Sequence, residues 1–242
     1  MSLGCYACEC DIYWTSDNDV IVAHADSKDQ VNGLHPWEHT AAEIIAAQRL
    51  SNYERIPTLS EYIDIVMEAG SKTKLLLDIK MIDNPSVDYE HPAKAALRAI
   101  EIIQEKNAQN FCEFICTSYE GVMKLIAPAI NASGIPCGWM NGGLSAASFK
   151  SKGYTNWANL NTRDHFKLGV EGSPDKCTGN RTITEFKNAG LQLSIFHLDK
   201  TSGNSSAVYT EENVQLYLNE YQYLRCITTN YPAWLIAKTK NL

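Results

Sequence analysis

An α/β fold, and within that class a TIM-type (β/α)8 barrel, is predicted by the order of apolar segments in this 242-residue sequence. From Pro57 onward, short apolar runs typical of strands alternate with longer segments of helical periodicity. No second zone of composition interrupts the chain, so we expect a single domain over residues 1–242. With 45% hydrophobic and 20% charged residues, the chain has a globular composition that excludes disordered and coiled-coil classes.

The N-terminal elements do not follow the regular alternation of strands and helices that begins at Pro57. The first strand is predicted at residues 5–11, and a hairpin-like segment over residues 13–19 follows it. A second apolar run ends at His24. Residues 25–56 are then polar before they become helical in pattern over residues 41–50. They are predicted to form a small insertion that leaves the main scaffold.

The rest of the chain repeats a strand–helix unit, and Pro57-Thr58-Leu59-Ser60-Glu61 carries the residues that open a helix. No glycine-rich phosphate turn follows an early strand, which disfavours a doubly wound sheet. Seven barrel strands result rather than eight, so we expect a first strand and helix upstream of this chain. Further strands are predicted at residues 74–79, 111–117, 135–140, 156–160, 191–198 and 225–229, and further helices at residues 92–106, 119–130, 146–152, 182–189 and 211–221.

Three of the early apolar runs end in side chains that can bind a metal ion or transfer a proton. Residues two apart on a strand share one face, and the chemistry of a parallel barrel gathers where its strands end. Carboxylates so gathered suit Ca²⁺ or Mg²⁺, and a nearby histidine can move protons, which together predict metal-assisted cleavage of a phosphate ester. Taken singly, they could instead be solvated carboxylates or an ordinary ion pair. The residues are Glu9, Asp11, His24, Asp78 and Lys80.

Six short motifs along the chain resemble, in order, the pattern of the glycerophosphodiester phosphodiesterase family. The resemblance spans nearly the whole sequence, and it implies metal-dependent hydrolysis of glycerophosphodiesters to glycerol 3-phosphate and an alcohol. The motifs are Glu9-Cys10-Asp11-Ile12, Thr15-Ser16-Asp17, Val22-Ala23-His24, Ile56-Pro57-Thr58-Leu59-Ser60-Glu61, Leu76-Leu77-Asp78-Ile79-Lys80 and Thr228-Thr229-Asn230-Tyr231-Pro232.

The resemblance also implies that the insertion at residues 25–56 lies beside the active site, and it implies a role for each candidate residue. His24 would be one of two acid/base histidines, and Lys80 would help to hold the phosphate. The cation, Ca²⁺ or Mg²⁺, would be bound by Glu9, Asp11 and Asp78.

The chain departs from the family pattern at several places. The opening His-Arg-Gly motif has no counterpart, so the second histidine and a phosphate-binding arginine would be absent. Asp78 replaces a glutamate, as in the similar sphingomyelinase D phospholipases, and Ala25 separates His24 from Asp26. Phe196 stands where a tryptophan is usual and would form an apolar wall for the substrate. Two alternatives follow: a truncated or degenerate barrel that binds a cation or phosphorylated ligand without turnover, and a sphingomyelinase D-like phospholipase.

The net charge and the hydropathy of the chain limit which partners it can have. A net charge of -7 without a basic stripe disfavours nucleic acid. No apolar run reaches the ~20 residues of a membrane-spanning helix, and no secretion signal opens the chain. As written, the protein is predicted to be cytoplasmic, and an upstream start could add an export signal. We expect a small-molecule phosphodiester as substrate, and a homodimer that covers the strand edges of an incomplete barrel.

Overall fold

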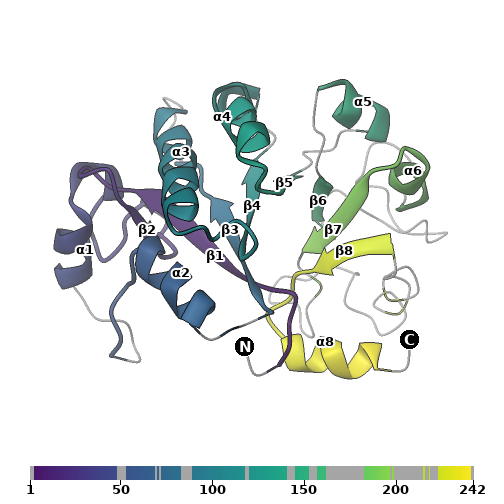
Figure 1. Ribbon diagram of the computed structural model, residues 1–242, viewed down its shortest axis with the longest axis horizontal. Helices are drawn as coiled ribbons and strands as arrows, with labels where there is room; N and C mark the ends of the chain where they lie inside the picture. The colour runs from purple at the N-terminus through teal and green to yellow at the C-terminus, as the bar shows by residue number, and fades with distance from the viewer. Residues whose placement is uncertain are drawn as a thin grey trace. The chain divides into compact units, whose positions relative to one another are not determined.

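The computed structural model confirms the α/β class (Figure 1). It divides into two compact units, Leu3–Cys137 and Gly138–Leu242. The single domain expected over residues 1–242 stays a prediction. The residues that the structure describes are 3–47, 53–68, 70, 72–82, 89–117, 120–140, 145–152, 157–161, 183–196, 198, 215, 218 and 223–240.

The first unit contains a sheet with strand order β2-β1-β3-β4. Strand β1 is parallel to β3, and β3 is parallel to β4, whereas β2 is antiparallel to β1. The elements are β1 (Ala7–Trp14), β2 (Val20–Val22), the 3₁₀ helix η1 (Pro36–Glu38), α1 (Ala41–Ala47), α2 (Leu59–Glu68), β3 (Lys74–Ile79), α3 (Glu90–Glu105), β4 (Cys112–Thr117) and α4 (Glu120–Ser133).

The second unit repeats parallel strands in the order β5-β6-β7-β8. The predicted helix at residues 211–221 lies outside the described residues, apart from two single positions. The elements are β5 (Cys137–Met140), whose first residue belongs to the first unit, α5 (Ala146–Ser151), β6 (Trp157–Asn161), α6 (Ile183–Asn188), β7 (Gln192–Phe196), β8 (Leu224–Ile227) and α8 (Pro232–Thr239).

The predicted strands and helices recur in the described residues with small shifts at their ends. Strand β1 continues three residues past its predicted end at Asp11, because Ile12, Tyr13 and Trp14 pair with β2. The hairpin turn is therefore shorter than predicted. Three parallel strands in the first unit and four in the second match the seven barrel strands of the sequence pattern. An absent first strand and helix stay a prediction.

Apolar periodicity explains how the first unit is packed. Strand β3 contains an unbroken run of buried leucines, Leu75 to Leu77, as expected for a parallel strand covered on both faces. Helix α3 buries alanines and isoleucines along one side, and it packs against β1 and α4. Residues between β2 and α2 form a separate hydrophobic cluster with the hairpin, which holds them beside β1: Tyr13, Ile21, Ala25, Val31, Ala41, Ile44 and Ile56.

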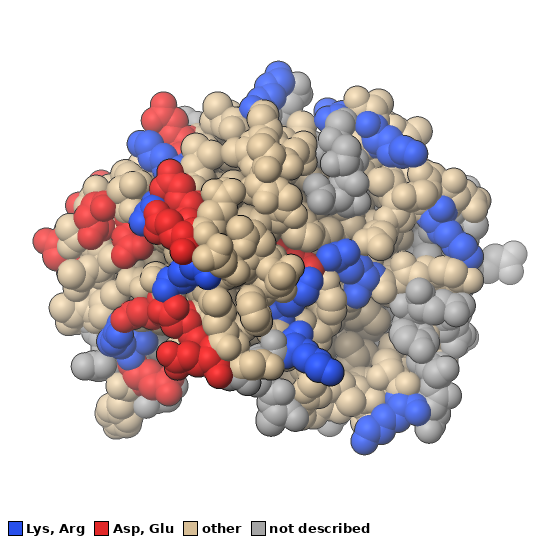
Figure 2. Space-filling model, in the orientation of Figure 1, with Lys and Arg blue, Asp and Glu red and all other residues tan. Residues whose placement is uncertain are grey.

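Charged side chains on the outer helices form surface pairs. Figure 2 shows acidic and basic side chains next to one another over α2 and α3. Among them, Arg98 donates to Glu101 at 2.8 Å, and Lys106 of the α3 C-terminus donates to Asp64 of α2 at 2.5 Å. Such exposed pairs add little stability individually. No helix in the described part of the chain has the length and hydropathy required to cross a membrane.

Candidate metal centre

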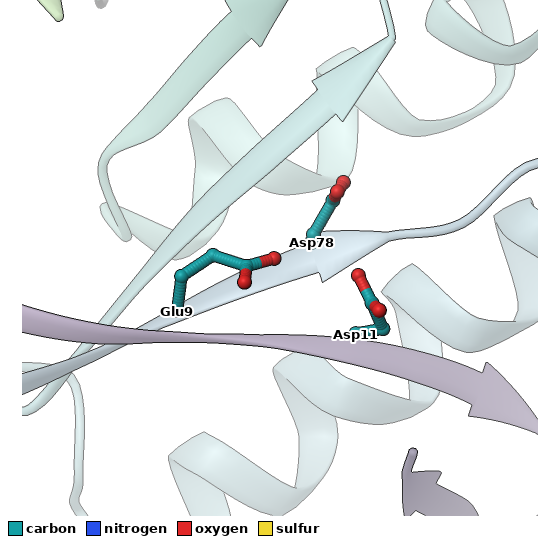
Figure 3. Close-up of side chains that lie close together, drawn as sticks. All are labelled: Glu9, Asp11 and Asp78. Atoms are coloured by element: carbon teal, nitrogen blue, oxygen red, sulfur yellow. The ribbon is translucent and has the colours of Figure 1, made fainter. Parts of the chain in front are cut away.

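Three carboxylates converge on one face of the first unit's sheet. Glu9 and Asp11 lie two residues apart on β1, so their side chains share a face. The parallel register pairs Asp11 with Asp78 of β3, which brings the third carboxylate to the same face. Figure 3 shows the three side chains pointing toward one another, and one oxygen from each lies within 4.8 Å of the others. We call Glu9, Asp11 and Asp78 the carboxylate cluster.

The burial of the carboxylate cluster favours a bound cation. Asp11 and Asp78 are 9% and 8% exposed, whereas Glu9 is exposed. Asp78 Oδ1 is buried and has no hydrogen-bond partner among the residues that the structure describes. Leaving such an acceptor unsatisfied costs about 1–3 kcal/mol, and more when the group is charged. A hard cation would satisfy this oxygen, so the donors present fit Ca²⁺ or Mg²⁺.

Lys80 and His24 flank the carboxylate cluster. The Lys80 Nζ atom lies 3.1 Å from Asp11 Oδ1 and 3.0 Å from Asp78 Oδ2. His24 Nε2 lies 3.8 Å from Asp11 Oδ2, and the imidazole side chain is 79% exposed. A hydrogen bond of 3.1 Å from the Ala23 N–H to the Asp11 carbonyl anchors the backbone before His24. One residue, Asp11, thus contacts both flanking side chains.

The electrostatics of this site reflect an excess of negative charge. Part of Glu9 is exposed, but partial burial of its carboxyl group, followed by repulsion from Asp11 and Asp78, raises its pKa to about 7. Burial also raises the pKa of Asp78, although Lys80 opposes the shift. For Lys80, burial acts to lower the pKa, but attraction to Asp78 and Asp11 raises it overall. Three carboxylates face one ammonium group, so a divalent cation would balance the charge.

Phe196 lies in the second unit, where it ends β7 and is half-buried. The structure therefore brings together five of the six predicted site residues, and the sixth belongs to the other unit. The roles assigned to all six residues stay predictions.

Two of the family-like motifs are structural. Thr15 donates to Asp17 Oδ1 at 2.7 Å, and the same oxygen accepts from the Ala41 N–H at 3.1 Å, which ties the hairpin turn to α1. The Thr58 and Glu61 side chains each accept from the other's backbone N–H, at 3.3 and 3.0 Å, and this capping box starts α2. These motifs shape the elements around the carboxylate cluster without joining it.

Sequence reasoning missed a further buried carboxylate on the same face. Glu113 of β4 is 0% exposed, and its Oε1 atom accepts from Tyr6 and Lys74, each at 2.6 Å. Its register partner on β3 is Leu76, two residues before Asp78. The signal in the sequence was a single acid within an otherwise apolar strand. We call Glu113, Lys74 and Tyr6 the Glu113 network.

Solved structures of glycerophosphodiester phosphodiesterases resemble this chain over nearly its whole length. One from Parabacteroides distasonis has 18% identity and a TM-score of 0.70, covering 99% of this chain and 86% of that one. One from Agrobacterium tumefaciens has 11% identity and a TM-score of 0.65, covering 98% and 88%. An Oleispira antarctica phosphodiesterase in complex with the product sn-glycerol-3-phosphate has 15% identity and a TM-score of 0.64, covering 98% and 85%.

No protein-family model matches the sequence, and no curated protein does. The likeness to solved structures therefore shows the fold: the chain folds like the glycerophosphodiester phosphodiesterases. This agrees with the family resemblance in its ordered motifs.

Proposed function

We propose that this protein, whose fold is that of the glycerophosphodiester phosphodiesterases, hydrolyses glycerophosphodiesters to glycerol 3-phosphate and an alcohol with the help of a divalent cation. One observation carries the proposal: the carboxylate cluster combines three convergent acids with a buried, unpartnered Asp78 oxygen. The product complex of the Oleispira antarctica phosphodiesterase supports the choice of substrate class.

Glu9, Asp11 and Asp78 would hold Ca²⁺ or Mg²⁺, since both cations prefer carboxylate oxygens. A bound cation polarises a phosphoryl oxygen and offsets the negative charge that develops there. Asp78 is one methylene shorter than glutamate, and its free Oδ1 atom supports a ligand role despite that shorter reach.

His24 and Lys80 would act directly on the substrate. The exposed His24 imidazole can reach a bound ligand, and its Nε2 atom lies 3.8 Å from Asp11 Oδ2. His24 would donate a proton to the oxygen of the departing alcohol, a contribution typically of ~10²–10⁴ in rate. The Lys80 ammonium would bind a phosphate oxygen. Phe196 would offer the substrate an apolar contact.

A second candidate is a protein that binds a cation and a phosphorylated ligand without turnover. It is favoured by the described histidines, among which His24 is the one with an ion-pair contact to the carboxylate cluster. Family members use two acid/base histidines. A site with a single such histidine would bind the phosphorylated ligand without completing the proton transfers of hydrolysis.

Hydrolysis of a panel of glycerophosphodiesters, with Ca²⁺, Mg²⁺ or chelator, tests the proposal. We expect cation-dependent release of glycerol 3-phosphate, lost in Glu9→Ala and His24→Ala. His39→Ala is the matched control, because His39 pairs at 3.8 Å with Glu43, at the start of α1. Unchanged activity in both site variants would refute the assignment. Cation binding without hydrolysis would identify the second candidate.

The homodimer expected from the sequence belongs to the same proposal. Light scattering of the purified chain at high concentration would measure its mass in solution. A monomer at all concentrations would rule out the homodimer and leave the assignment of activity untouched.

A further inference from the structure

We infer that Lys80 occupies the cation position of the metal-free site, and that a divalent cation must displace its ammonium group from Asp11 and Asp78 in order to bind. Lys80 would then be an internal competitor of the cation as well as a phosphate contact. The inference rests on the cation site of the proposed function, but it concerns binding and not turnover.

The position of the ammonium group is the first argument. The Nζ atom lies 3.1 Å from Asp11 Oδ1 and 3.0 Å from Asp78 Oδ2, so it bridges two of the three proposed ligands. Those two carboxylates are the buried members of the carboxylate cluster. Two like charges within a few ångströms repel strongly in a partly buried site. A divalent cation and the Lys80 ammonium therefore cannot share these two carboxylates at low cost.

The state of Asp78 is the second argument. The Lys80 ammonium group donates to Asp78 Oδ2, while the buried Oδ1 atom of the same carboxylate has no hydrogen-bond partner in the described part of the chain. A monovalent ammonium group thus leaves the cluster only partly satisfied. A divalent cation can satisfy more of these oxygens at once, which provides the driving force for exchange.

Lys80 is also built to move. It follows directly after the last residue of β3, Ile79, and lies outside the strand's ladder. The side chain is 30% exposed, so its long stem can carry the ammonium group toward solvent without unfolding the strand. Once released, the group is free to bind an anion. The cation would therefore prepare Lys80 for the phosphate, and binding of the two should be mutually favourable.

Isothermal titration calorimetry with Ca²⁺ and with Mg²⁺ tests the competition directly. The measurements use the wild-type chain, Lys80→Met and Lys94→Met at pH 8.5, above the pKa of about 7 of Glu9. Lys94→Met is the matched control, because it removes the same charge from an exposed position on α3. We expect Lys80→Met to bind the cation about tenfold more tightly than the wild type or better, and Lys94→Met to bind like the wild type. Equal or weaker binding by Lys80→Met would overturn the inference.

Lys80→Arg provides an independent check if Lys80→Met fails to fold. This variant keeps the positive charge, so we expect no gain in cation affinity. A gain in Lys80→Arg would contradict displacement of a competing charge. A third measurement is the affinity for inorganic phosphate, which should rise on addition of Ca²⁺ by a larger factor in the wild type than in Lys80→Met; an equal rise in both proteins would contradict the release of Lys80 by the cation.

These outcomes separate the inference from the proposed function. Tighter cation binding by Lys80→Met in a protein without hydrolytic activity supports the competition and rejects the enzyme assignment. Hydrolysis by the wild type together with unchanged cation affinity in Lys80→Met rejects the competition alone.

Discussion

The carboxylate cluster and the Glu113 network lie on the same face of one sheet and use the same kinds of side chain, yet they differ in charge balance. In the Glu113 network, one buried carboxylate accepts from one lysine and one tyrosine. In the carboxylate cluster, one lysine pairs with two of the three carboxylates, and a buried Asp78 oxygen has no hydrogen-bond partner among the described residues. The comparison teaches that a buried acid marks a candidate site when its charge is in excess, and a structural ion pair when its charge is matched.

The largest effect is expected from a substitution that breaks the Glu113 network. Lys74→Met would remove the lysine that pairs at 2.6 Å with the fully buried Glu113, and breaking a buried pair in this way typically costs about 3–5 kcal/mol. We expect the free energy of unfolding, measured by urea denaturation in chelator, to fall by about 3 kcal/mol. Cation affinity of the folded protein should stay as in the wild type. A stability change no larger than that of Lys94→Met would show that the Glu113 network is not structural.

A substitution within the carboxylate cluster should have the opposite pattern of effects: it should weaken cation binding without lowering stability. Asp78→Asn removes a charge that nothing fully balances, so the metal-free protein should be as stable as the wild type or more so. Cation affinity, measured by calorimetry, should fall by about 100-fold, equivalent to about 2.7 kcal/mol. Asp64→Asn, at a surface aspartate paired with Lys106, is the control. Retained affinity in Asp78→Asn would remove Asp78 from the ligand set.

The pH dependence of cation binding sharpens the contrast. With a pKa of about 7 in the metal-free protein, Glu9 must lose a proton before it can bind a cation. Apparent affinity should therefore fall by up to about tenfold per pH unit below pH 7, and Glu9→Gln should lack this dependence. Calorimetry in buffers of different ionisation enthalpy would count the released proton.

The same titration affects the stability of the metal-free protein, with a definite sign. The folded-state pKa of Glu9 lies above the ordinary value of 4.5, so the folded state holds this proton more tightly than the unfolded state. The contribution of Glu9 to the free energy of unfolding should therefore fall as the pH rises from about 4.5 through 7. A rise over that range that Glu9→Gln abolishes would contradict the assignment.

The smallest effect is expected at a surface carboxylate that is paired with an arginine. Glu61 pairs with Arg55 and caps α2, and these hydrogen bonds lower its pKa to about 2. Because its folded-state pKa is depressed, the stabilisation is present above about pH 4.5 and is lost as the pH falls toward 2. Glu61→Gln should cost less than about 1 kcal/mol at pH 7 and nothing measurable near pH 2. Thermal unfolding beside Glu68→Gln, at the end of the same helix, would measure this.

Local sequence pattern determined much of this protein's fold and the content of its site. Alternation along β1 placed Glu9 and Asp11 on one face, and the apolar run of β3 ended where Asp78 and Lys80 lie. These features depend on periodicity and strand length, which neighbouring residues encode. The end of β1 was misjudged, because its last residues became strand by pairing with β2, and pairing is not a local property.

Only the tertiary structure decided how these residues meet. The register that sets Asp11 beside Asp78 joins strands far apart in the sequence, and a slip of one residue would have turned one carboxylate to the other face. The bridge from Lys80 to both acids, the burial of Asp78 Oδ1 and the pairing of Glu113 follow from that packing. The sequence by itself determined which chemical groups end the strands, and the sheet decided which charges are matched, because burial and distance belong to the folded chain.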